Sequence, residues 1–186
     1  MTAPRNEQLP GQRQVADQRF LGIMAKFWIP GQVKTRLARE IGDQAAALIH
    51  RLFTLHLGEQ LSLAADYRHV FTAPDQECGN MQAAIGERWI AVPQGNGDLG
   101  MRMSRAFQCL LGLGNPLDHN PVVLVFSCTK QVIDDLGLGC GYLGIREDID
   151  TVECLHRLLL SDDLDQELRA SIRLLLNPAM NPSQPL

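Results

Sequence analysis

A buried strand that runs into a basic loop and then a helix is the feature that most constrains the fold of this chain. Residues 19–25 are apolar enough for a strand buried on both faces of a parallel sheet. Pro30 and Gly31 then form a turn. Lys34 and Arg36 fall in or beside the first turn of the next helix, where the helix dipole disfavours positive side chains unless an anion lies between them. The pattern predicts a phosphate site.

Length and charge predict one soluble α/β domain with a polar tail at each end. The chain has 186 residues, of which 45% are apolar, and a net charge of −4 without long blocks of either sign. We expect a domain over residues 19–176, a disordered tail over 1–18 and a flexible tail over 177–186. The charge pattern argues against a nucleic-acid surface. The sequence has neither a membrane-spanning run nor an apolar leader, so we predict a cytoplasmic location.

Alternating strand and helix patterns predict a doubly wound, mostly parallel sheet. After the first strand, β-branched and aromatic runs predict further strands over residues 67–73, 88–92 and 121–126. A long helix, with Asp43 as a plausible N-cap, is expected to cover one face of the sheet. A short helix is expected over residues 81–87. The helix predicted between the strands at 88–92 and 121–126 carries one apolar stripe, which consists of Met103, Ala106, Phe107 and Leu110.

A glycine-rich loop follows the third predicted strand. Its glycines are Gly95, Gly97 and Gly100. Their spacing matches the Gly-x-Gly-x-x-Gly pattern of dinucleotide-binding folds, so that alternative has to be weighed. The acid about twenty residues on, Asp118, precedes the next strand instead of following it, and Asp98 inside the loop would face the pyrophosphate. Both features argue against a nicotinamide or flavin site, and Asp98 is equally suited to cap a helix that begins near Leu99.

Two motifs resemble a glycosyltransferase-A-like family of unknown function, of the radical-SAM/selenodomain-associated transferase type. They are Ala25-Lys26-x-x-x-Pro30-Gly31-x-Val33-Lys34-Thr35-Arg36-Leu37 and Gln94-Gly95-x-Gly97-Asp98-Leu99-Gly100-x-Arg102-Met103. The match covers roughly residues 19–126. It implies a three-layer α/β domain like that of nucleotide-diphospho-sugar transferases, and a nucleotide or nucleotide-sugar as ligand. The residues that it assigns to the nucleotide and its phosphates are Lys26, Gly31, Lys34, Arg36, Gly95, Gly97, Asp98, Leu99 and Gly100.

The second half of the chain departs from the family pattern. Three carboxylates that the family carries after the fourth strand are replaced, by Cys128, Gln131 and Gly139. The stretch between Cys128 and Gly139 is also shorter than the roughly dozen residues of a parallel crossover, so the domain is expected to be truncated. The resemblance implies Mg²⁺ or Mn²⁺ as cofactor, which oxygen ligands would hold.

Other acids and the cysteines leave further alternatives open. Replacement metal ligands would have to come from Asp134, Asp135, Asp148 and Asp150. A helix cap at Asp150 or Thr151 explains that region without a metal. The five cysteines are widely spaced, which favours reduced packing residues over disulfides, a zinc site or a nucleophile at Cys128. The five histidines have no ligand spacing.

These observations predict a transferase that moves a glycosyl or nucleotidyl group from a nucleotide donor. Fixed cations would stabilise the charge that develops on the leaving phosphate. Loss of the family carboxylates keeps a second hypothesis open, that of a non-catalytic nucleotide-binding or scaffold protein. The shortened domain would leave a sheet edge uncovered, and such an edge favours pairing into a homodimer.

Overall fold

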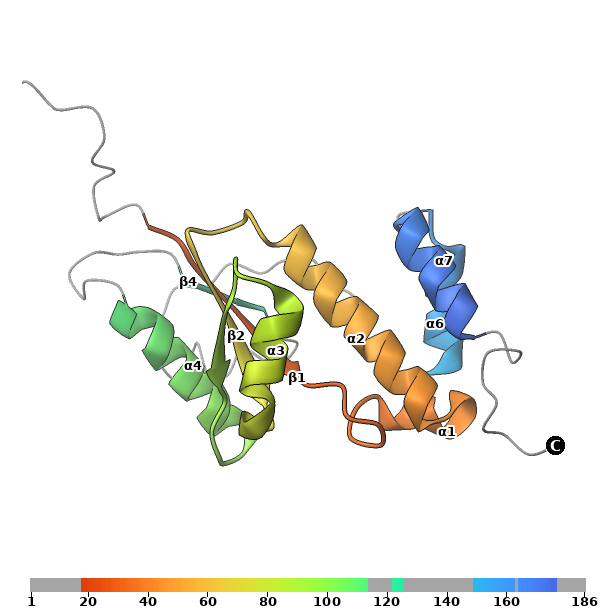
Figure 1. Ribbon diagram of the computed structural model, residues 1–186, viewed down its shortest axis with the longest axis horizontal. Helices are drawn as coiled ribbons and strands as arrows, with labels where there is room; N and C mark the ends of the chain where they lie inside the picture. The colour runs from red at the N-terminus through yellow and green to blue at the C-terminus, as the bar shows by residue number, and fades with distance from the viewer. Residues whose placement is uncertain (1–17, 114–121, 126–148, 163, 177–186) are drawn as a thin grey trace, which may run out of the picture.

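A four-stranded parallel sheet is the centre of the computed structural model, which describes residues 18–113, 122–125, 149–162 and 164–176 (Figure 1). The strand order is β3-β2-β1-β4. The strands are β1 (Phe20–Lys26), β2 (Tyr67–Ala73), β3 (Ile90–Pro93) and β4 (Val122–Val125). β1 lies between β2 and β4, and Ile23 is in register with Val70 on one side and Val125 on the other. The predicted parallel sheet is therefore confirmed.

Helices cover the two faces of the sheet because apolar side chains alternate along β1. On one face Phe20 packs with Phe71 and with the buried stripe of α4 (Leu99–Leu113), whose residues are Met103, Ala106, Phe107 and Leu110. On the other face Leu21 and Ile23 pack with Met81 of α3 (Cys78–Ile85). The stripe predicted for α4 is confirmed, and the arrangement has three layers.

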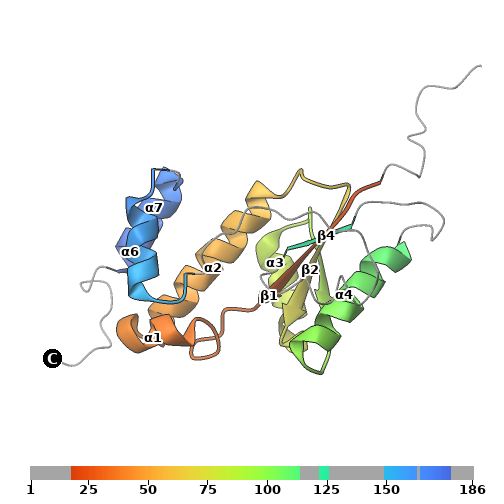
Figure 2. The same ribbon diagram turned by 180° about the vertical axis from the view of Figure 1, so that it is seen from behind.

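A third apolar cluster joins four helices beside the sheet. The helices are α1 (Thr35–Ile41), α2 (Asp43–Gln60), α6 (Val152–Leu160) and α7 (Gln166–Leu175). Leu37, Ile49, Leu155 and Ile172 are fully buried in this cluster. In both views α2 lies between the sheet, with α3 and α4, and the α6–α7 pair (Figures 1 and 2). The prediction that α2 covers a sheet face is wrong, because its buried side chains pack on other helices instead.

Three predicted boundaries are corrected. Asp43 is the first residue of α2 and makes no capping bond, since Gly42, at φ 86°, occupies the N-cap position. The third strand begins at Ile90, because Trp89 belongs to the preceding turn, where its amide donates to the Gly86 carbonyl. The short helix α3 begins at Cys78, after the 3-10 turn η2 (Asp75–Glu77), and ends at Ile85, since Gly86 takes a left-handed φ of 89°.

Several predictions lie wholly or partly outside the described residues. They concern the tails over 1–18 and 177–186, of which only residue 18 is described, and the residues Asp118, Cys128, Gln131, Asp134, Asp135, Gly139 and Asp148. The single domain over 19–176 stays a prediction. No helix in the part of the chain that the structure describes combines the length and apolar character that a bilayer crossing requires.

Candidate functional site

A cavity of about 720 Å³ opens where β1 ends. It lies between β1, the start of α1, the middle of α2 and residues 149 and 150. Ligands of open parallel sheets bind at the carboxyl ends of the strands, because the loops there converge on one edge. The cavity therefore occupies the place in which a site is expected for this topology.

The charge around this cavity is predominantly positive. Of the residues that the structure describes, four cationic ones line it, namely Lys26, Lys34, Arg36 and Arg102, against the single acid Asp150. Three of the four are residues that the sequence predicted as phosphate ligands, and the structure brings them to one cavity. Arg102 comes from the first turn of α4 and was part of the motif without being predicted as a ligand.

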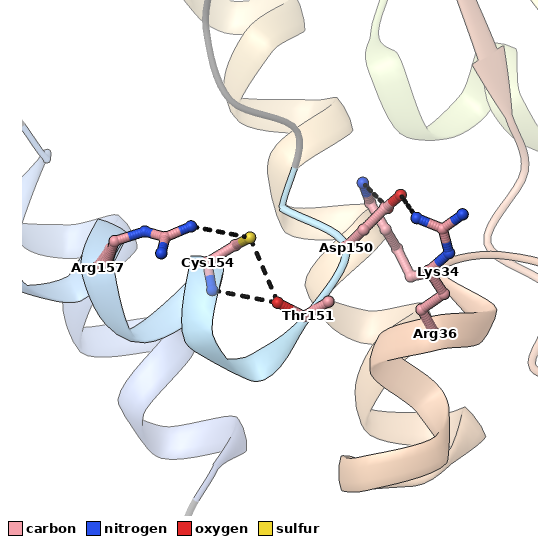
Figure 3. Close-up of polar contacts among 6 residues, drawn as sticks. All are labelled: Lys34, Arg36, Asp150, Thr151, Cys154 and Arg157. Atoms are coloured by element: carbon pink, nitrogen blue, oxygen red, sulfur yellow. Dashed lines mark hydrogen bonds and ion pairs between the residues drawn. The ribbon is translucent and has the colours of Figure 1, made fainter.

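Lys34 and Asp150 form a charge pair in the cavity. The Lys34 Nζ lies 3.1 Å from the Asp150 Oδ1, and the Arg36 Nη1 lies 4.0 Å from the Asp150 Oδ2 (Figure 3). The Lys34 side chain is only 14% exposed, against 73% for Arg36. The backbone of Lys34 is left-handed, with φ 46° and ψ 43°, a conformation that is unfavourable for a residue other than glycine. Lys34 thus combines an unfavourable backbone conformation with an ion pair to a residue far away in the sequence.

The N-terminus of α6 positions Asp150. Thr151 is the N-cap of this helix, and its Oγ1 accepts a hydrogen bond from the Cys154 amide at 3.4 Å. Cys154 Sγ in turn accepts from Thr151 Oγ1 and from Arg157 Nη2 (Figure 3). The helix is anchored through Leu155 in the four-helix cluster. Of the two predicted caps, the structure therefore selects Thr151, and it leaves the Asp150 carboxylate to face Lys34.

A second cavity, of about 480 Å³, adjoins the first. The two share Lys26, Gln32 and Arg102 among their lining residues. The second is further lined by Gly95, Gly97 and the segment that follows β2, which includes Asp75. The Gly95 amide donates to the Asp75 Oδ1 at 3.0 Å, so the two loops are tied together at this cavity.

The glycines of the loop over residues 95–100 allow its backbone to lie close to Arg105. The Arg105 guanidinium donates to the carbonyls of Gln94 and Asn96, which places it inside the loop. A Cβ at Gly95 would clash with the Arg105 guanidinium, and Gly95 and Gly97 have φ values of 73° and 113°. The spacing that resembled a dinucleotide fingerprint therefore builds a loop around an arginine side chain.

Gln94 connects this loop to the sheet. Its side chain is almost fully buried, and its Nε2 donates to the carbonyls of Ala25 and Phe71, at 3.1 and 2.7 Å. The Gln94 Oε1 accepts a bond from the Arg102 Nη1 at 3.2 Å. One amide thus holds the ends of β1 and β2 together and directs a cation toward both cavities.

The other predicted site residues have structural positions. Leu99 lines the first cavity. The Asp98 Oδ1 accepts from the Met101 amide at 2.9 Å and so caps α4, which confirms the predicted cap, and Gly100 lies inside that helix. Gly31 takes a φ of 78° in the turn before α1. Gly31, Asp98 and Gly100 line neither of these two cavities.

Sequence reasoning missed Asp75, Arg102 and Arg105 as residues of this site. Asp75 ends the predicted second strand, and Arg102 stands in the quoted motif, so a signal was present for these two. Arg105 gives no signal, because its partners are carbonyl groups, which any sequence supplies.

The described residues do not assemble a site for the Mg²⁺ or Mn²⁺ that the resemblance implied. Among them, no group of three or more histidines, cysteines and acids stands close enough to hold a metal ion. The part of the chain that the structure describes lines each cavity with one carboxylate, and each of these is engaged, Asp150 with Lys34 and Asp75 with the Gly95 amide. Oxygen-ligated cations require several such groups. We therefore derive no chemical step through a metal ion.

Comparisons with known proteins give one structural neighbour that bears on the site. The sequence matches no protein-family model and no curated protein. The structure is similar to that of a putative nucleotide-diphospho-sugar transferase from Desulfovibrio desulfuricans G20, with 25% sequence identity and a TM-score of 0.51. The match covers 65% of this chain and 55% of the other, so the chain spans about half of its neighbour. The comparison supports an α/β fold of the glycosyltransferase-A-like kind, as the resemblance implied.

Proposed function

We propose that this chain binds a nucleotide or nucleotide-sugar at the two adjoining cavities and acts as a glycosyl- or nucleotidyltransferase. In this proposal Lys26, Lys34 and Arg36 hold the phosphates, together with Arg102. The loop of residues 95–100 lies against the nucleoside. The radical-SAM/selenodomain type of transferase remains part of the proposal.

The observation that carries the proposal is the convergence of four cations on one cavity at the carboxyl end of β1. Neutralising a diphosphate requires at least two positive charges, and such charges accumulate at one edge of this small domain, although the chain as a whole is negative. The structural neighbour supports the same ligand class.

The position of the shared cations supports a division of the ligand between the cavities. Lys26 and Arg102 line both, so a diphosphate bound there would direct its nucleoside to one side and its transferable group to the other. Fixed cations at this point would also stabilise the charge that develops on a leaving phosphate or pyrophosphate.

A thermal melt in the presence of nucleoside diphosphates and nucleotide-sugars tests the proposal. A ligand at 100 times its dissociation constant stabilises a protein by about 2.7 kcal/mol, which raises the melting midpoint of a chain of this size by roughly 5–10 °C. The shift should be lost when Lys34 and Arg36 are both changed to Ala. Arg39→Ala is the matched control, because Arg39 is exposed on the same helix and lines neither cavity. Absence of a shift with every compound would contradict the proposal.

The same melts with Mg²⁺, Mn²⁺ or chelator, followed by a turnover assay, separate transfer from binding. A shift that needs metal, together with turnover, would support the transferase. A metal-independent shift without turnover would leave only nucleotide binding, in agreement with the sparse carboxylates of the described residues.

A further inference from the structure

The second cavity has an aromatic residue among those that line it. Phe27 lines it, and the Phe27 ring stacks on Trp28 with 4.3 Å between the ring centroids. The Arg51 guanidinium lies 5.7 Å from the centroid of the Trp28 ring, a cation–π arrangement that restrains the pair further. A held aromatic ring at the wall of a polar cavity suits a planar heterocycle.

Among the described residues, Asp75 is the only acid that lines this cavity. A carboxylate repels phosphate, so the nucleotide would turn its neutral base toward Asp75 and its phosphates toward Lys26 and Arg102. An ionised carboxylate is an acceptor only, with about four lone-pair sites on its two oxygens. The Gly95 amide uses one of these on Oδ1. The remaining acceptor sites call for donors from the ligand.

The bases differ in what they offer to such a group. Guanine presents adjacent donors at N1 and at its 2-amino group. Adenine and cytosine place an acceptor next to their amino group, and uracil flanks its single N–H with two carbonyls, so each leaves the carboxylate facing an acceptor. We propose that Asp75 makes this cavity selective for guanine, with its carboxylate accepting from N1–H and N2–H. This inference rests on the proposed function, because it concerns the base of the nucleotide that the site would bind.

The competing explanation is that Asp75 only holds the glycine loop through the Gly95 amide. Asp75→Asn separates the two, since Asn keeps an acceptor oxygen for Gly95 and presents an amino group as donor. That exchange removes the match to guanine and creates a match to xanthine, whose N1–H is followed by a carbonyl at position 2. Glu77→Gln is the control, because Glu77 lies in the same turn, lines neither cavity and accepts a hydrogen bond from the Asn80 Nδ2.

Calorimetric titration with GDP, IDP, XDP, ADP, UDP and CDP is the test. The unaltered chain should bind GDP at least about tenfold more tightly than IDP, which lacks the 2-amino group, and than the other four, as loss of a charge-assisted hydrogen bond requires. Asp75→Asn should reverse the preference between GDP and XDP, and Glu77→Gln should not alter it. The comparison of GDP with IDP uses the unaltered chain, so it can still be made if the Asp75→Asn variant does not fold.

The outcomes distinguish this inference from the proposed function. Equal binding of GDP and IDP, or an Asp75→Asn chain that folds and keeps the original preference, overturns the role of Asp75 while nucleotide binding stands. Failure of all six diphosphates and of inorganic pyrophosphate to bind overturns the proposed function itself.

Discussion

The ammonium group of Lys34 lies 3.1 Å from the carboxylate of Asp150, which follows it by 116 positions in the chain. The pair joins the start of α1 to the residue before the α6 cap (Figure 3), and both residues line the first cavity. The Asp150 carboxylate therefore already pairs with Lys34, which is one of the residues proposed to bind the phosphates. A carboxylate and a phosphate would then compete for the same ammonium group.

Replacing Asp150 by Asn should tighten binding of pyrophosphate in the absence of metal. The change removes one negative charge from beside Lys34 and Arg36, and we expect affinity to rise about fivefold, which corresponds to ~1 kcal/mol for a partly exposed pair. Titration calorimetry at low salt measures this. Asp162→Asn is the control, because Asp162 is exposed and lines neither cavity. Weaker binding in the Asp150 variant would show that the carboxylate contributes to anion binding instead of opposing it.

Removal of the α6 cap should lower the stability of the whole four-helix cluster. Thr151→Ala eliminates the side-chain acceptor for the Cys154 amide, and we expect a loss of about 1 kcal/mol in the free energy of unfolding. Urea titration followed by circular dichroism gives this value. Thr151→Ser retains the hydroxyl and should stay close to the original. Equal losses in the two variants would contradict the capping role.

Two glycine substitutions should act in opposite directions. Gly95→Ala puts a side chain at a left-handed φ of 73° and against the Arg105 guanidinium, and the backbone strain should destabilise the chain by about 1–3 kcal/mol. Gly112→Ala lies inside α4 with no neighbour within 4 Å of the added carbon, and should stabilise it by about 0.5–1 kcal/mol. Thermal melts of both chains measure the difference. A neutral Gly95→Ala would mean that residue 95 does not keep its left-handed φ.

His69 should make stability depend on pH. It is 3% exposed on β2, and its Nδ1 has no hydrogen-bond partner among the described residues. Burial lowers the pKa of His69 below its ordinary value of 6.5, so the unfolded chain binds a proton more readily than the folded chain. The contribution of neutral His69 to the free energy of unfolding should therefore be complete above about pH 6.5. Below that pH the free energy of unfolding should fall, by up to ~1.4 kcal/mol per pH unit.

Urea titrations between about pH 5 and 7.5 measure this slope. His69→Gln should flatten it, whereas His156→Gln should not, because His156 is exposed on α6. An unchanged slope in the His69 variant would assign the pH dependence to other groups.

Local patterns in the sequence were sufficient for most of the sheet and its covering helices. The apolar run of β1, the β-branched run of β2 and the stripe of α4 each carry their signal within a few residues. The placement of α2 was not predictable in this way. Its apolar side chains indicate that one face of the helix is buried, but they do not identify the elements that cover it. The partners in α6 and α7 lie about a hundred residues further along the chain.

The candidate site shows the same limit. The motif predicted Lys26, Lys34 and Arg36, because their spacing is local. The ion pair of Lys34 with Asp150 and the bond between Asp75 and Gly95 depend on how loops from different strands meet, which no local pattern records. Trp89 illustrates the same point in the core, since its Nε1 donates to the Gly58 carbonyl of α2.

The most direct test of the account is a calorimetric titration of nucleoside diphosphates into three chains: the unaltered protein, the Lys34→Ala/Arg36→Ala double variant and the Arg39→Ala control. The account predicts saturable binding in the first and third and a loss of at least about tenfold in affinity in the second, since two phosphate-binding charges are removed. Equal affinity in all three chains would place the phosphates elsewhere and contradict the central claim.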